Sequence, residues 1–252
     1  MSARRTLLAA LAISVGFAAP AWAQTAAADA HSAAPFGMAM NDQRVYSHLL
    51  LDQFEDRTTG GDHVLHWDAE GWIGTDSDRL WLKSEGTVAS NGKVEDGRHE
   101  LLYAKPISPY FDVQAGVRYD LDSRPGRGWA ALGVEGLAPY LFDVSATLYA
   151  SDGGRYAARF SAAYDLLLTQ RLILTPRVEA NLYAKDDPAR RIGSGLSDID
   201  SGLRLRYEIT RKFAPYVGVS WEQKFGTTAD FARADGERAS DWRFAFGVRS
   251  WF

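Results

Sequence analysis

The 252-residue chain contains no cysteine, and this absence excludes disulfide bonds and thiolate metal sites. Neither sign of charge dominates, because 28 Lys and Arg stand against 32 Asp and Glu and the formal net charge is −4. A nucleic-acid partner is therefore not expected, since such partners are bound by strongly basic surfaces.

Long apolar runs are absent after the N-terminal segment. Arg4 and Arg5 precede an apolar run over 6–19, and Ala21-Trp22-Ala23 follows it before Gln24. This order is typical of a secretory signal peptide and predicts cleavage after residue 23. A membrane anchor helix is less favoured, because spanning a bilayer needs about 20 apolar residues. Any later membrane insertion must therefore use a closed barrel of strands.

Residues 24–43 are small and polar. Such a composition buries too little apolar surface to fold, so we predict a flexible, disordered arm in the periplasm. Its only residues of chemical interest are His31, Met38 and Met40.

Alternation of apolar and polar residues is the main signal in the rest of the chain. In the C-terminal stretch Trp242 and Phe244 fall on one face of a strand, and Arg243 and Arg249 fall on the other. Such an aromatic face would promote aggregation in water, whereas contact with lipid in a closed barrel removes the hazard. Similar alternation predicts twelve strands, at 44–54, 62–73, 79–90, 98–107, 111–122, 128–138, 141–151, 155–168, 171–184, 198–210, 213–225 and 241–252.

Connection lengths test this count independently. Short turns follow the fourth, sixth, eighth and tenth predicted strands, and longer polar loops follow the third, fifth, ninth and eleventh. Short periplasmic turns and long external loops are typical of outer-membrane barrels. We therefore predict an all-β fold: an antiparallel transmembrane β-barrel of 12 strands over residues 44–252, with both termini in the periplasm.

A soluble β-sandwich or lipocalin-like barrel is the alternative, with apolar faces inward and charges outward. Aromatic residues at predicted strand ends favour the membrane barrel, because aromatic girdles mark membrane interfaces. These aromatic residues are Tyr110, Tyr140, Tyr149 and Tyr183. Pro176 disagrees with a regular strand, since proline donates no ladder hydrogen bond, so we expect a bulge or a break there.

In a membrane barrel the polar faces line the lumen, and the first four strands bring imidazole and carboxylate groups to it. Crowded carboxylates repel one another unless a cation or protons neutralise them. Carboxylate with imidazole suits a divalent transition metal, and added methionine shifts the preference toward copper. The candidate metal ligands are His48, Asp52, His66, Asp68, Glu70, Glu85 and Glu100 on the strands and Met38 and Met40 in the arm. The alternative is that these residues are an ordinary polar lumen wall.

The patch depends on strand registers, because a slip of one residue moves every side chain to the other face. The expected neighbours are Glu70 with Lys83, Asp68 with Glu85, Asp52 with His66, His48 with Glu70, and Glu100 with Glu85.

Several stretches of the chain resemble the copper-resistance protein B family. They are Leu-Leu-Asp-Gln-Phe-Glu at 50–55, Gly-Trp-Ile-Gly at 71–74, Leu-Trp-Leu-Lys at 80–83, Gly-Val-Arg-Tyr-Asp at 116–120, Gly-Leu-Ala-Pro-Tyr at 136–140, Asp-Leu-Leu-Leu-Thr-Gln-Arg at 165–171, Gly-Ser-Gly-Leu-Ser-Asp at 193–198, Phe-Ala-Pro-Tyr-Val-Gly at 213–218 and Val-Arg-Ser-Trp-Phe at 248–252. The resemblance implies an outer-membrane barrel of Gram-negative bacteria that binds copper and helps to clear it from the periplasm. Members often carry a long arm rich in Met and His, and this chain departs from that pattern.

The leading hypothesis is a non-enzymatic outer-membrane protein that binds, and could export, a copper ion. Copper would be taken up at Met38 and Met40 and passed to the lumenal patch, with a periplasmic copper protein as a candidate partner and outer-membrane lipid around the barrel. A general porin is the alternative. An outer-membrane hydrolase is less favoured, because it needs Ser, His and a third polar group on one outward face, and His66 is expected to point inward.

Overall fold

The computed structural model describes residues 44–59, 62–122 and 125–252. The predicted signal peptide (1–23) and the predicted arm (24–43), with His31, Met38 and Met40, lie outside the described residues. In the described part of the chain, no helix is long and apolar enough to cross a membrane.

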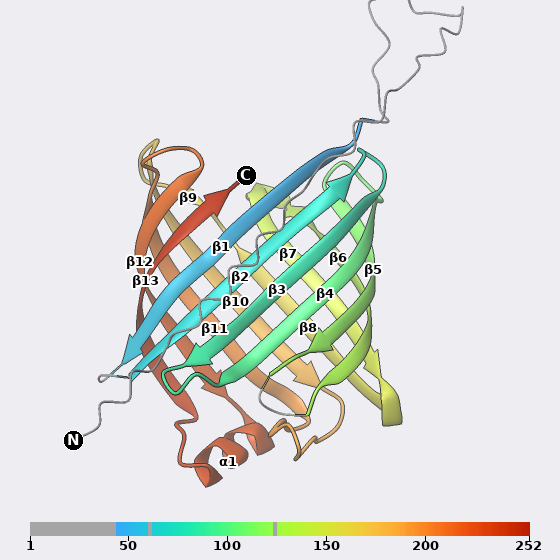
Figure 1. The fold of residues 1–252 in the computed structure, drawn as a ribbon, viewed down its shortest axis with the longest axis vertical. Coiled ribbons are helices and arrows are strands. Elements are labelled where there is room, and N and C mark those ends of the chain that lie inside the picture. The colour runs from blue at the N-terminus through green and yellow to red at the C-terminus, as the bar shows by residue number, and fades with distance from the viewer. Residues whose placement is uncertain (1–43, 60–61, 123–124) are drawn as a thin grey trace, which may run out of the picture. The chain divides into compact units, whose positions relative to one another are not determined.

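One antiparallel sheet closes on itself to form a barrel (Figure 1). Its strands are β1 (Tyr46–Thr59), β2 (Asp62–Gly74), β3 (Arg79–Ala89), β4 (Val94–Pro106), β5 (Phe111–Asp120), β6 (Arg127–Ala138), β7 (Phe142–Ser151), β8 (Arg155–Ala163), β9 (Leu166–Leu167), β10 (Leu172–Tyr183), β11 (Gly195–Tyr207), β12 (Phe213–Lys224) and β13 (Ser240–Trp251). Each strand pairs with its neighbours in order, β13 pairs with β1, and β10 pairs with β11. Because β8 and β9 both pair with β10, they are successive parts of one strand, and the predicted barrel of 12 strands is confirmed.

The interruption between β8 and β9 lies opposite Pro176. Arg177 is the last residue of β10 paired with β8, and Leu174 is paired with Leu166 of β9. On the other side of β10, Pro176 keeps its place opposite Leu203 of β11. The missing N–H of proline therefore coincides with a gap in the neighbouring strand. The expectation of a bulge or break in the strand of Pro176 itself is wrong, because β10 runs through Pro176 without a register shift.

The two faces of the sheet differ as the alternation predicts. Outward side chains are apolar and exposed, for example Leu82 at 59% and Val117 at 57%, whereas inward side chains such as Glu55 and Arg118 are charged and buried. An apolar belt facing outward and a polar lumen are the pattern of a barrel in a membrane.

The two ends of the barrel carry different connections. At the terminal end, where β1 begins and β13 ends, the connections are short, and one of them contains the 3-10 helix η1 (Pro139–Leu141). At the opposite end, called here the helix end, lie the 3-10 helix η2 (Asp152–Gly154), the long connection over 184–194, and the helix α1 (Gly226–Ala234) (Figure 1). The expected long loop after the third strand is wrong, because β4 begins already at Val94 and a tight turn at Gly92, with φ +80°, joins it to β3.

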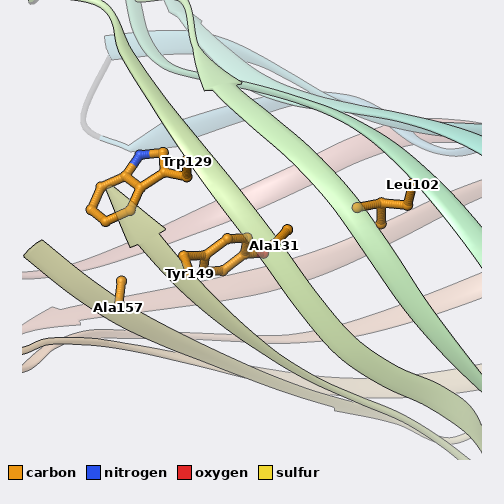
Figure 2. Close-up of a cluster of buried hydrophobic side chains, with 5 residues drawn as sticks. All are labelled: Leu102, Trp129, Ala131, Tyr149 and Ala157. Carbon is orange, nitrogen blue, oxygen red and sulfur yellow. The ribbon is translucent and has the colours of Figure 1, made fainter. Parts of the chain in front are cut away.

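A small apolar cluster lies inside the barrel, on the wall formed by β4 to β8 (Figure 2). Its members are Leu102, Trp129, Ala131, Tyr149 and Ala157, with Trp81 and Tyr183 packed against it. Tyr149 and Tyr183 are therefore lumenal, and their assignment to a membrane girdle was wrong. Both tyrosines lie near the ends of their strands, which is where a membrane girdle is expected, but their side chains fall on the inward face. Tyr110 and Tyr140 are exposed, as expected.

Candidate functional site

The lumen contains two chambers. A chamber of about 310 Å³ lies toward the terminal end, with Leu141 and Asp165 in its wall. A larger chamber of about 530 Å³ lies toward the helix end, where Thr228 and Ala232 of α1 line it. The residues that border both chambers are Gln53, Glu85, Arg98 and Arg177. Charged side chains at mid-height therefore separate the two spaces.

Ion pairs across the lumen form this separation. Arg159 Nη2 lies 2.6 Å from Glu85 Oε2 and also pairs with Glu179. Arg98 Nη2 lies 3.7 Å from Glu179 and 3.9 Å from Glu85. These four residues come from β3, β4, β8 and β10. Because they join different strands through the interior, they fill the bore rather than line it.

A β-bulge in β1 sends two successive side chains into the lumen. The register between β1 and β2 shifts between Leu51 and Gln53, so Asp52 is the extra residue. Its Oδ1 accepts a hydrogen bond from Arg249 Nε at 2.7 Å, and its Oδ2 accepts one from Arg177 Nη1 at 3.1 Å. Asp52 shares the inward face with Leu50, and the bulge adds Gln53 to the lumen directly after it.

Arg177 also reaches Asp68, whose Oδ2 lies 2.9 Å from Arg177 Nη1. The structure thus brings together two predicted ligands, Asp52 and Asp68, with a guanidinium between them. Charge-assisted bonds of this kind are strong in a site with little water. A metal ion at this point would have to displace Arg177.

The predicted registers are partly correct. Glu70 does lie opposite Lys83, and Asp68 does lie opposite Glu85. In the first hairpin the prediction is wrong, because β1 extends to Thr59 and contains the bulge at Asp52. The observed partners there are Glu55 with His66, Trp72 with His48, and Leu50 with Glu70.

The predicted pairing of Glu100 with Glu85 is also wrong. Lys83 lies opposite Glu100, and Arg98 lies opposite Glu85. The slip is two residues, which keeps both carboxylates on the inward face but changes their neighbours from acids to bases. The like-charge contact that suggested a bound cation is therefore absent at this place.

Three of the remaining candidates, His66, Glu70 and Glu100, have polar partners of their own. His66 is buried, and its Nδ1 lies 3.1 Å from the Thr87 hydroxyl. Glu100 accepts a hydrogen bond of 2.7 Å from the Tyr149 hydroxyl. Glu70 lies 3.9 Å from Lys83 Nζ. Over residues 44–59, 62–122 and 125–252, no group of three or more His, Asp or Glu side chains is arranged to hold a metal ion.

His48 lies apart from the carboxylates, among aromatic rings on the inward face near the terminal end. Its ring centroid is 5.7 Å from that of Trp251 and 6.4 Å from that of Trp72. A further indole, Trp81, lies 6.2 Å from Trp72. Among the four histidines in the described residues, His48 alone has no hydrogen bond or ion pair to a described residue.

A family model described as "Copper resistance protein B precursor (CopB)" matches residues 45–252. The chain belongs to this copper resistance protein B family. It is 46% identical over 216 residues to "Copper resistance protein B" of Escherichia coli and, over the same length, to the "Copper resistance protein B homolog" of Pseudomonas syringae pv. tomato. Each match covers 86% of this chain and 73% of the relative.

Among solved structures, the NanC porin resembles this chain with a TM-score of 0.52 and 12% identity, covering 81% of this chain and 99% of the porin. At this identity the likeness concerns the fold alone.

The donor groups in the lumen of the barrel divide into two kinds. Most inward carboxylates are already neutralised by arginine or lysine, as Asp52 and Asp68 are by Arg177. The imidazole of His48 is not committed in this way. Sequence analysis included His48 but missed Trp72 and Trp251 as its neighbours. Trp72 and Trp251 lie two places after the inward residues Glu70 and Arg249, so the period of two in the sequence already predicts that both indoles face inward.

An outward polar trio bears on the hydrolase alternative. Ser84 Oγ lies 3.1 Å from His99 Nδ1, and Trp67 Nε1 donates to Ser84 Oγ at 3.1 Å. Each of the three residues lies two places from an exposed leucine on its own strand. Side chains two places apart share a face, so all three face the lipid belt. Because the indole can only donate, the serine hydroxyl is left to donate to His99. No carboxylate in the described part of the chain bonds to His99, so the trio lacks the acid of a catalytic triad.

Proposed function

We propose that this protein is a non-enzymatic barrel of the bacterial outer membrane that binds copper and contributes to copper resistance. The observation that carries the proposal is the family match over 45–252, which spans the whole described barrel. Relatives of 46% identity that are named for copper resistance support the same function.

The outer membrane is the location that suits the exposed apolar belt. Side chains such as Leu132 at 56% and Phe244 at 62% exposure would be costly in water over so large an area, whereas lipid covers them. The proposal places the N-terminal arm in the periplasm, because short turns mark the periplasmic end of such barrels.

The proposed copper ligands remain the predicted set. They are His48, Asp52, His66, Asp68, Glu70, Glu85 and Glu100 in the barrel and Met38 and Met40 in the arm. The ion pairs of Arg177 limit how the carboxylates can act, because a cation must compete with a guanidinium for Asp52 and Asp68. The imidazoles are the less encumbered donors. Export from the periplasm, aided by a periplasmic copper protein, is part of the proposal.

Copper tolerance of living cells tests this function. A strain that lacks the protein is supplied with the wild type, with the double variant His48→Ala/His66→Ala, or with His63→Ala, whose imidazole pairs with Asp56 on the outer surface. We expect the wild type and His63→Ala to restore tolerance equally and the double variant to restore less. Equal tolerance and equal copper content for all three would reject the site, and no gain from the wild type would reject the function.

A general porin is the second candidate, favoured by the fold shared with the NanC porin. The ion pairs between the two chambers disfavour it, because they cross the bore at Arg159 and Arg98. Conductance in a planar bilayer, with and without copper, separates the two. A large conductance that is insensitive to copper would support the porin.

A further inference from the structure

The aromatic rings around His48 form a separate site in the wall of the lumen. His48 lies directly opposite Trp72 in the ladder between β1 and β2, and Leu50 lies opposite Trp251 in the ladder between β13 and β1. Three adjacent strands thus bring one imidazole and two indoles to the same inward face. The backbone of Leu49 bonds to that of Phe252 at 3.0 and 2.8 Å, which fixes the start of β1 against the end of the chain.

We propose that His48, Trp72 and Trp251 form a cage for a soft monovalent metal cation, Cu⁺. The inference rests on the proposed copper function and names the oxidation state and the place of first contact in the barrel. A ring nitrogen supplies a lone pair, and an indole face attracts a cation through its quadrupole, more strongly than a tyrosine or phenylalanine face does.

The indoles are held in position before any ion arrives. Trp251 Nε1 donates a hydrogen bond of 2.7 Å to the backbone oxygen of Arg211, and Lys212 Nζ lies 5.0 Å from the Trp251 ring centroid. Arg79 lies over Trp72, with its guanidinium carbon 5.3 Å from the ring centroid. Rings fixed in this way lose little freedom when they bind, which favours affinity.

The surrounding charges select a monovalent ion. No hydrogen bond or ion pair in the described part of the chain joins the three cage side chains to a carboxylate. The cations Arg79 and Lys212 lie over the rings of Trp72 and Trp251, and repulsion from them doubles for a divalent ion. Divalent copper also prefers several nitrogen and oxygen donors in a tetragonal set, whereas the cage offers one imidazole.

The charge of Arg79 is partly offset, because its Nη1 lies 2.8 Å from Asp112 Oδ2. A monovalent ion therefore meets less repulsion at the Trp72 side than the formal charge of Arg79 suggests. With a single nitrogen donor, the cage leaves coordination positions of its ion open. Such a site can pass an ion onward to the chamber at the terminal end, because Leu50 lines that chamber.

Binding of Cu⁺ and of its redox-stable analogue Ag⁺ to the mature chain, folded in detergent without oxygen, tests the cage. Affinity is measured by competition with a coloured Cu⁺ chelator, and tryptophan fluorescence reports contact with the indoles. The variants are His48→Ala, His48→Gln, Trp72→Leu and Trp72→Phe, with His63→Ala and Trp221→Leu as controls at the helix end. Folding of each variant is checked by its heat-dependent gel mobility.

We expect both His48 variants to weaken Cu⁺ binding at least tenfold and Trp72→Leu to weaken it about three- to thirtyfold. Trp72→Phe, which keeps an aromatic face, falls between Trp72→Leu and the wild type, and both controls match the wild type. Loss of the Ag⁺-induced fluorescence change in the His48 variants would accompany the loss of affinity.

Three results would overturn the cage. Equal Cu⁺ affinity in all variants, or binding of Cu²⁺ without Cu⁺ or Ag⁺, rejects the cage and leaves the copper function standing. A wild-type protein that binds neither Cu⁺ nor Cu²⁺ rejects the proposed function and the cage together.

Discussion

Arg204 holds Glu55 with two parallel hydrogen bonds inside the barrel, from Nε at 2.9 Å and from Nη2 at 2.7 Å. Glu55 is only 1% exposed, and Arg57 Nε donates to it at 2.6 Å. The carboxylate therefore neutralises guanidinium groups from two strands, β1 and β11, that are far apart in the sequence and share no backbone ladder.

Removal of this carboxylate should destabilise the barrel strongly. In Glu55→Ala, Arg204 would lose the carboxylate that pairs with its buried charge, and Arg57 would keep only its longer contacts of 3.3 Å with Asp200 and Gln53. We therefore expect the free energy of unfolding to fall by about 3–5 kcal/mol. Urea unfolding in lipid vesicles measures it. Asp230→Asn, which breaks an exposed pair with Arg233, should change it by less than about 1 kcal/mol. A loss for Glu55→Ala no greater than for Asp230→Asn would contradict the buried network.

Arg177 should control passage through the lumen. It borders both chambers and bridges Asp52 and Asp68, so Arg177→Ala removes a side chain from the separation, frees the Asp68 carboxylate and leaves Asp52 paired with Arg249 alone. We expect a higher conductance in planar bilayers and a shift toward cation selectivity. Arg233→Ala, on the exposed face of α1, should behave like the wild type. An unchanged current in Arg177→Ala would show that other groups close the bore.

A charged side chain on the outward face should lower the free energy of unfolding more in the middle of the apolar belt than at its rim. Leu132 lies mid-strand in β6, and Tyr110 lies in the connection between β4 and β5 at the terminal end. We expect Leu132→Arg to lower the free energy of unfolding by about 2–4 kcal/mol and Tyr110→Arg by about 0–1 kcal/mol. Vesicle unfolding measures both. Small and equal changes would mean that this face does not meet lipid.

The outward trio should contribute to stability rather than to catalysis. Ser84→Ala leaves the Trp67 N–H and the His99 ring nitrogen without their partner in an apolar surrounding, which should cost about 1–3 kcal/mol. Ser201→Ala, which loses only a long bond of 3.4 Å to the Trp221 carbonyl, is the matched control. Labelling of Ser84 by a fluorophosphonate would contradict the non-enzymatic assignment.

Alternation of residue types was sufficient to predict the fold. Strand faces follow from a period of two, so the inward direction of Asp68, Glu70 and Glu85 could be predicted without any knowledge of their partners. Pro176 pointed to an irregularity at the right height of the barrel, because the missing N–H is a property of the residue itself, but the interruption lies in the neighbouring strand, between β8 and β9.

The partners in the lumen could not be predicted from local patterns. Asp52 meets Arg177 and Arg249, which are 125 and 197 residues away, and only barrel closure brings them together. The bulge that turns Gln53 and Glu55 inward has no glycine or proline to announce it. Glu85, Asp52 and Asp68 are paired with arginines from distant strands. That His48 has no hydrogen bond or ion pair to a described residue became evident only in three dimensions.

Native mass spectrometry of the folded mature barrel, loaded with copper in detergent and then freed of excess metal, tests the central claim most directly. The account predicts about one copper ion retained per folded wild-type chain and a clear loss of that ion in His48→Ala/His66→Ala, with His63→Ala unchanged. A folded wild-type barrel that retains no copper under reducing or oxidising conditions would contradict it.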